Sequence, residues 1–271
     1  LTLALMLDSG ADHARLAFAQ AQADLHHGDI ARAALRQISP QSPYTSSARI
    51  MEAWMLVREG RRDEAIALMH ATADAGDARA KRALADIYRD GRRDAEAEAI
   101  YSELLAATPD DWRLWFARGA ARERMGQASE GEADLRHALQ LAPEQPDVMN
   151  YLGFSWIDRG EHMAEGVAMI TRAAALRPES GAIVDSLGWA YYRMGDYPRA
   201  LEKLEHAVEL EAGDPTLNDH LGDLYWRLGR RIEARYQWRR ALSLTPDDPA
   251  TLQQKVERGL PDEPPTRAAR R

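Results

Sequence analysis

The sequence predicts an all-α fold in which pairs of helices stack into a solenoid, because it repeats itself with a fixed period. Glycines recur 34 or 35 residues apart, at Gly126, Gly160, Gly195 and Gly229. Alanines and prolines keep the same period, at Ala173, Ala207 and Ala241 and at Pro109, Pro143 and Pro178. With 271 residues the chain is longer than a typical single-core domain, so we expect two domains or one elongated array. The period is typical of a helix-turn-helix array and favours the second organisation.

The composition excludes several classes of protein. Hydrophobic residues make up 45% of the chain and charged residues 29%, as in a soluble folded protein, and no apolar run is long enough to cross a bilayer. The formal net charge of −8 argues against nucleic acid as a partner, since proteins that bind its backbone concentrate Lys and Arg. Because cysteine is absent, there are no disulfides, thiolate metal sites or cysteine nucleophiles. The opening LTLALMLDSG lacks a starting Met and a basic leader, so we expect residues 1–13 to be the remnant of a truncated preceding repeat in a longer protein.

The segment 181–214 illustrates how each pair of helices is encoded. Apolar and small residues fall on one face of each predicted helix: Leu187, Gly188 and Tyr191 on the first, and Ala200, Leu204 and Ala207 on the second. Small residues on these faces let the two helices approach closely. Between the helices Gly195 permits a positive φ, Asp196 is predicted to cap the second helix, and Pro198 lies in its first turn.

These residues resemble the tetratricopeptide repeat family, whose pattern is Trp-x2-Leu-Gly-x2-Tyr followed by Ala-x3-Phe, Ala and Pro. Three segments carry the pattern in register: YLGFSWIDRG from residue 151, SLGWAYYRMG from residue 186 and HLGDLYWRLG from residue 220. Upstream the pattern weakens, and Arg118 and Arg122 stand where a Leu and a Tyr are expected. The resemblance implies an all-α, right-handed α-solenoid, that is, an α-α superhelix.

We therefore expect about seven repeats, followed by a capping helix at 249–260 and a disordered tail at 261–271. The expected repeats are 14–45, 46–77, 78–111, 112–145, 146–180, 181–214 and 215–248. The capping helix is predicted to cover the apolar end of the last repeat, which a solenoid needs for solubility.

The resemblance also sorts the aromatic residues, because the first helix of each repeat lines the concave face in this family. Tyr191 lies on the side of its helix that faces the second helix and is predicted to be core. Trp115, Trp156 and Trp238 are predicted to pack in the same manner within their own repeats.

Residues rotated away from that side are predicted to bind a partner, because exposed aromatics beside charges are typical of binding surfaces. The predicted partner-binding residues of the concave face are Tyr151, Phe154, Asp158, Asp185, Trp189, Tyr192, Arg193, Asp219, Asp223, Trp226 and Arg227. Trp189 and Trp226 have an alternative role, which is to pack half-buried against the first helix of the next repeat.

An earlier stretch of the concave face is mostly charged. Its residues are Arg79, Arg82, Asp86, Arg89, Asp90, Arg113, Phe116, Glu123 and Arg124. Such a face is either simply solvated, which is the usual fate of charge runs, or it steers an acidic partner segment toward the aromatic half.

The sequence carries no familiar catalytic motif: it lacks a glycine-rich phosphate loop, an H-E-x-x-H helix and a G-x-S-x-G turn. Its eight histidines are scattered over different repeats and are predicted to lie on the surface. Asp219 and His220 are placed to share a hydrogen bond, but no nucleophile accompanies them. We therefore expect no enzyme activity, cofactor or metal site in this segment.

A narrower resemblance covers residues 151–242, about a third of the chain. It is to the C-terminal repeats of proteobacterial envelope proteins, which include lipoprotein adaptors that dock a periplasmic carboxyl-terminal processing protease. The resemblance implies a lipidated or exported scaffold on the periplasmic side of the cell envelope, and without it the chain would be assigned to the cytoplasm.

Three functions follow from these observations. The first is a non-enzymatic scaffold or adaptor whose concave groove binds a peptide or helix of another protein, with the processing protease as one such partner. The second is the regulatory or substrate-binding arm of an enzyme, a peptidase or a glycosyltransferase, whose catalytic domain lies upstream. The third, an assembly that only self-associates, ranks lowest because a capped end disfavours stacking.

Overall fold

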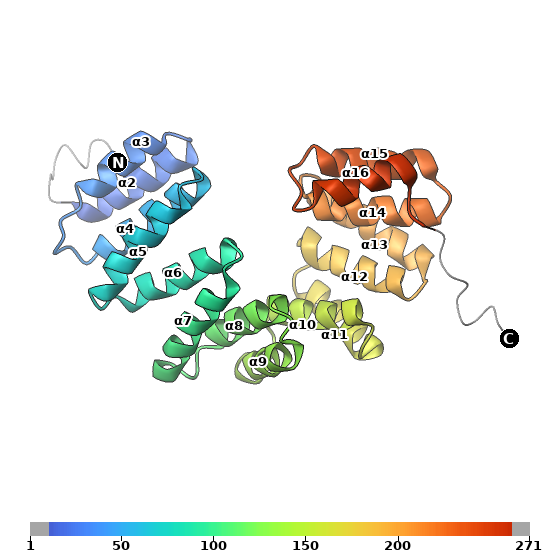
Figure 1. Ribbon diagram of the computed structural model, residues 1–271, viewed down its shortest axis with the longest axis horizontal. Helices are drawn as coiled ribbons and strands as arrows, with labels where there is room; N and C mark the ends of the chain where they lie inside the picture. Colours follow the sequence, from blue (N-terminus) through green and yellow to red (C-terminus); the bar gives the residue numbers. More distant parts are fainter. Residues whose placement is uncertain (1–10, 262–271) are drawn as a thin grey trace. The chain divides into compact units, whose positions relative to one another are not determined.

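The computed structural model describes residues 11–261, which form fifteen α-helices and no β-strand (Figure 1). The predicted all-α class is therefore confirmed. The chain divides into two compact units, one ending at Leu141 and one beginning at Ala142. Residues 1–10 of the expected remnant and 262–271 of the expected tail lie outside the described residues.

The first unit contains four pairs of helices, coloured blue to green in Figure 1. They are α2 (Asp12–Asp24), α3 (Gly28–Arg36), α4 (Thr45–Arg58), α5 (Arg62–Asp74), α6 (Ala78–Asp90), α7 (Asp94–Ala107), α8 (Trp112–Arg124) and α9 (Ala128–Leu141). The second helix of one pair packs against the first helix of the next, as α5 does on α6 and α7 on α8. The core that results is continuous from α4 to α8 and includes Met69, Ile87 and Tyr101.

The second unit contains three pairs and a final single helix. They are α10 (Pro146–Arg159), α11 (Met163–Leu176), α12 (Gly181–Arg193), α13 (Tyr197–Leu210), α14 (Pro215–Arg227), α15 (Arg231–Leu242) and α16 (Pro249–Arg258). The first helices contact one another in the order α10, α12, α14 and so form a row. We call the side of this row that carries Phe154, Trp189 and Tyr192 the first-helix face. The single helix α16 packs on α15 in the place where the first helix of a further pair would lie.

The turn between α12 and α13 has the structure that its residues predict. Gly195 adopts a φ of +76°, in the left-handed region that glycine enters without strain. The carboxylate of Asp196 accepts a hydrogen bond from the backbone N–H of Arg199 at 3.3 Å, which confirms the predicted helix cap. Tyr191 is buried, as predicted, and Leu204 is fully buried on the facing side of α13.

The two helices of a pair approach so closely that a glycine on the first lies against a large side chain on the second. A Cβ atom at Gly222 would lie 2.6 Å from the indole of Trp238, and one at Gly188 would lie 2.7 Å from Leu204. The same close approach recurs between Gly153 and Ile170 and between Gly119 and Leu135. Side chains at these positions would push the pair apart, so the glycines set the spacing of the helices.

The tryptophans predicted to pack within their repeats do so. Trp238 is fully buried and Trp156 is 4% exposed. Trp115 is half-buried against the core of the first unit, where its indole N–H donates to the carbonyl of Pro109 at 2.7 Å and its ring lies 4.2 Å from that of His137.

The pair α8 and α9 replaces part of its apolar contact with a buried ionic cluster. Arg118 donates two hydrogen bonds of 2.8 Å to the carboxylate of Asp134, whose side chain is only 4% exposed. Arg122 donates to Asp134 at 2.9 Å and to Glu98 on α7 at 2.7 Å. The two arginines that break the repeat pattern therefore occupy core positions as partners of a buried acid.

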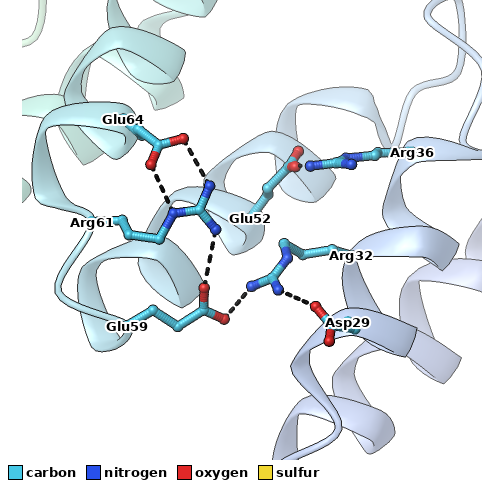
Figure 2. A network of polar contacts seen from close by, with 7 residues as sticks. All are labelled: Asp29, Arg32, Arg36, Glu52, Glu59, Arg61 and Glu64. Carbon is cyan, nitrogen blue, oxygen red and sulfur yellow. Dashed lines mark hydrogen bonds and ion pairs between the residues drawn. The ribbon is translucent and has the colours of Figure 1, made fainter.

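A chain of ion pairs connects α3 to the α4–α5 turn in the first unit (Figure 2). Arg32 donates to Asp29 on its own helix at 2.5 Å and to Glu59 just after α4. Arg61 donates to Glu59 at 3.3 Å and makes two hydrogen bonds of 2.7 Å to Glu64. Most of these groups are partly exposed, so the network orients the turn more than it stabilises the fold.

Candidate partner-binding surface

The second unit brings the predicted partner-binding residues together along the row α10, α12 and α14. Tyr151, Phe154 and Asp158 belong to α10; Asp185, Trp189, Tyr192 and Arg193 to α12; and Asp219, Asp223, Trp226 and Arg227 to α14. They differ in exposure: the two carboxylates Asp185 and Asp223 are buried, whereas Asp158 and Arg193 are exposed. That these residues bind a partner stays a prediction.

Trp189 lies at the centre of a stack of three rings. Its indole ring centroid is 4.7 Å from that of Tyr192, with 15° between the planes, and 4.0 Å from that of His220, with 17° between the planes. His220 is on α14, so Trp189 packs half-buried against the first helix of the next repeat, which is its alternative role. Aromatic stacking of this kind fixes the orientation of the indole.

His220 is not a surface histidine, and the prediction that it would be one is wrong. Its side chain is only 14% exposed, and its Nδ1 donates to Oδ2 of Asp185 at 2.7 Å. The predicted partner, Asp219, instead binds a lysine. His220 points inward because Asp185, 35 positions earlier, is a buried carboxylate that needs a hydrogen-bond donor.

Burial and charge set the protonation of this pair. Burial raises the pKa of Asp185, although the imidazole beside it opposes that shift. For His220 burial alone lowers the pKa, but the charge and hydrogen bond of Asp185, joined by the charges of Asp219 and Asp223, raise it above its ordinary value. The second oxygen of Asp185, Oδ1, has no hydrogen-bond partner among the described residues.

Lys255 on α16 pairs with two of the predicted site residues. Its Nζ donates to both carboxylate oxygens of Asp219, at 2.7 and 2.8 Å, and to Asp223 Oδ2 at 3.0 Å. Asp223 Oδ1 also accepts the indole N–H of Trp238 at 2.9 Å. Burial and the charge of Asp219 raise the pKa of Asp223. These acids therefore anchor the last helix to α14.

Trp226 and Arg227 are covered by the backbone that follows α16. The Trp226 indole N–H donates to the carbonyl of Leu260 at 3.2 Å, and the Arg227 guanidinium donates to that of Pro261 at 2.8 Å. Gly259 approaches the Trp226 ring so closely that a Cβ there would overlap it, at 1.8 Å. Both predicted anchors thus hold a short segment, Gly259–Pro261, by its carbonyl groups.

The remaining predicted residues lie toward α10. Arg193 donates to the carboxylate of Asp158 at 3.3 Å and to its backbone carbonyl at 3.2 Å. Phe154 is half-buried and packs on the core of the unit. Tyr151 is also half-buried.

The charged stretch of the first unit satisfies many of its charges internally. Asp86 accepts the hydroxyl hydrogen of Tyr101 at 2.6 Å, and Arg82 donates to Asp111 at 3.2 Å. Arg124 donates to both oxygens of Asp94 at 3.1 Å. This pairing is what a solvated, self-neutralising face requires, whereas steering of a partner stays a prediction.

Sequence reasoning missed Lys255 and the Gly259–Pro261 segment because both come from the end of the chain. One signal was present: acids and bases on neighbouring repeats lie 35 or 36 positions apart at Asp185 and His220 and at Asp219 and Lys255. Within residues 11–261, no group of three or more His, Asp or Glu residues could hold a metal ion. No helix of the same range is long and apolar enough to cross a membrane.

Stacked helix pairs with a row of first helices define a helical-repeat protein of the α-solenoid class. Family models described as tetratricopeptide repeat match residues 50–112 and 186–249 in one case and 84–150 in another. Together the matches span more than half of the chain, and the chain belongs to the tetratricopeptide repeat family. Chains of this family are generally non-catalytic scaffolds that bind other proteins.

Solved structures agree with this fold. A tetratricopeptide repeat protein from Parabacteroides merdae ATCC 43184 is 14% identical, with a TM-score of 0.73 over 91% of this chain and 97% of that one. A chain of the APC/C hetero-tetramer Cut9–Hcn1 is 15% identical, with a TM-score of 0.71 over 96% and 48%. PilF of Pseudomonas aeruginosa is 17% identical, with a TM-score of 0.55 over 67% and 85%. At these identities the likeness shows the fold alone, and no curated protein matches the sequence.

Proposed function

We propose that this chain is a non-enzymatic interaction scaffold whose first-helix face in the second unit binds a peptide or helix of another protein. The observation that carries the proposal is the aromatic row on α10 and α12. There Phe154, Trp189 and Tyr192 are half-buried and lie on the same row of helices as the Arg193–Asp158 ion pair. Rigid aromatics beside an arginine are the side chains that contribute most at protein interfaces.

The geometry shifts the expected centre of binding toward α10 and α12. On α14 Asp219 and Asp223 hold Lys255, and Trp226 and Arg227 hold the Gly259–Pro261 segment. A partner that used those residues would have to displace contacts already made within the chain. The stacked indole of Trp189 lies outside those contacts, and the exposed guanidinium of Arg193 is engaged by the exposed Asp158, so these two residues are the proposed anchors.

A finer proposal concerns the kind of partner. The narrower resemblance over residues 151–242 favours an adaptor on the periplasmic side of the cell envelope that presents a carboxyl-terminal processing protease with its substrates. Its support is that resemblance alone, and it is separable from the general scaffold function.

The experiment compares capture of partners from an envelope extract by the parent chain, by a Trp189→Ala, Arg193→Ala variant and by a Leu176→Ala control. Leu176 is 43% exposed and lies on α11, outside the first-helix face. Loss of a central aromatic anchor costs about 2 kcal/mol, which weakens binding roughly thirtyfold. We expect a specific partner to be held by the parent and the control but lost by the double variant, with unchanged helical circular dichroism.

Equal capture by all three chains would overturn the first-helix face as the binding site. Recovery of a partner other than a processing protease would overturn only the finer proposal.

A further inference from the structure

Helix α15 exposes two large apolar side chains one turn apart. Ile232 is 84% exposed and Tyr236 is 66% exposed, the highest values among the large hydrophobic residues of the described chain. They lie four positions apart, so they occupy one face of the helix. The opposite face of α15 buries Ala234, Trp238 and Ala241. Ile232 and Tyr236 therefore take no part in the packing of α15 on α14.

The preceding repeats show that the fold does not require apolar residues at these positions. The buried residues Ala234 and Trp238 align α15 with α13 at Ala200 and Leu204, and with α11 at Gly166 and Ile170. In that register Ile232 and Tyr236 correspond to Pro198 and Glu202 on α13 and to Ala164 and Ala168 on α11, all exposed. Among the three repeats of residues 146–248, only the last presents large apolar groups there.

The same face of α15 is positively charged, although the chain as a whole carries a formal charge of −8. The helix contains four arginines and one glutamate. Arg231 and Arg235 are used within the unit, donating to the carbonyls of Trp226 at 2.6 Å and Val256 at 3.1 Å. Arg239 and Arg240 are exposed, follow Tyr236 by three and four positions, and form no ion pair with any residue between 11 and 261.

We propose that Ile232, Tyr236, Arg239 and Arg240, the α15 stripe, form a second docking surface that binds an acidic segment of a partner protein. The apolar side chains of that segment cover Ile232 and Tyr236, and its carboxylates meet the two arginines. Arginine and tyrosine side by side are typical of interface anchors, and the guanidinium geometry suits carboxylates.

Two other occupants fit the stripe less well. A second copy of the chain related by a two-fold axis would bring two positively charged helix faces together, which is unfavourable. A membrane surface is held by a long apolar helix face or by two independent signals, and two side chains on one turn provide neither.

The probe is a fluorescein-labelled acidic peptide with leucines at i and i+4 and glutamates between them, titrated with the full chain and followed by fluorescence anisotropy. A peptide with glutamine in place of each glutamate is the charge control. Three variants are compared: Tyr236→Glu, which installs the residue type of position 202; Ile232→Ala, which installs that of position 164; and Arg239→Glu, Arg240→Glu. Met194→Ser, at an exposed apolar residue outside the stripe, is the matched control.

We expect the acidic peptide to bind, rising salt to weaken it, and Tyr236→Glu and the double arginine variant each to weaken it about tenfold or more. Ile232→Ala should have a smaller effect in the same direction, and Met194→Ser none. The Trp189→Ala, Arg193→Ala variant should bind the peptide normally, so failure of this inference and failure of the proposed function are distinguishable.

The inference is overturned if the acidic peptide does not bind, if the glutamine peptide binds equally well, or if all variants bind alike. It is also overturned if the stripe variants abolish binding to phosphatidylglycerol vesicles or a concentration-dependent mass in sedimentation, with no effect on the peptide. The residues substituted in the α15 stripe and in its Met194→Ser control are exposed, and circular dichroism of each variant verifies that it folds.

Discussion

The imidazole Nδ1 of His220 donates to Oδ2 of Asp185 at 2.7 Å, and this hydrogen bond joins two repeats across 35 residues of sequence. Both side chains are largely buried, and the indole of Trp189 stacks on the imidazole. The pair therefore links α12 to α14, and the stacked imidazole holds a predicted binding residue in place.

The stability of the second unit should depend on the protonation of this pair. The pKa of His220 is raised above its ordinary value of 6.5, so its contribution is complete below about pH 6.5 and is lost as the pH rises through the folded-state pKa. The raised pKa of Asp185 has the same effect on stability at lower pH. The native state binds this proton more tightly than the unfolded state does, so stability again decreases as the pH rises. We expect the urea midpoint, followed by circular dichroism, to decrease as the pH rises above about 6.5.

His220→Gln should remove that part of the pH dependence, whereas His206→Gln, at an exposed histidine of α13, should retain it. An identical pH profile for the parent and His220→Gln would show that the pair does not titrate in this range.

Replacement of Lys255 by Met should destabilise the last helix strongly. It leaves the carboxylates of Asp219 and Asp223 without their cation, and Asp223 is buried. Breaking a buried ion pair by removing one partner costs about 3 kcal/mol in free energy of unfolding, measured by urea titration.

Lys203→Met is the matched control, because Lys203 pairs with an exposed glutamate, Glu202. An exposed pair contributes less than about 1 kcal/mol. Equal losses in the two variants would show that Lys255 acts as a surface residue.

Gly195→Ala should destabilise the α12–α13 turn through its backbone alone. Its φ is +76°, and a Cβ there would meet nothing within 4 Å, so the cost is strain without a clash. We expect a loss of about 1 kcal/mol in urea titration.

Gly213→Ala is the control for the effect of backbone strain. That glycine also has open space around it but no positive φ, so the alanine variant should be neutral or slightly more stable. A loss at Gly213 as large as that at Gly195 would contradict the role of backbone strain.

The helices could be predicted from the sequence because their signals are local. Gly195 and Asp196 specify a turn and a cap within a few residues, and the spacing of Ala200, Leu204 and Ala207 specifies which side of α13 is buried. Trp156 and Trp238 could be placed in the core for the same reason.

The polar contacts of the surface could not be predicted to the same extent, because they depend on how side chains of different repeats meet. His220 turns inward to Asp185, and Lys255 reaches back from α16 to Asp219, each across a full repeat. The Gly259–Pro261 segment covers Trp226 through a backbone carbonyl. Every residue has such a carbonyl, so no pattern of residue types predicts this contact. Arg118 was identified only as a departure from the family pattern, since its buried partner Asp134 lies on another helix.

The glycines of the first helices lie against side chains of different size on the second helices, and the largest of these is in the last repeat. Gly119, Gly153, Gly188 and Gly222 face Leu135, Ile170, Leu204 and Trp238 in turn. The indole of Trp238 also requires an acceptor, Asp223, and the corresponding residue one repeat earlier is Trp189. A recombination event that moved α15 next to α12 would leave that indole N–H facing another indole, so α15 is suited to its own partner helix and not to that of the preceding repeat.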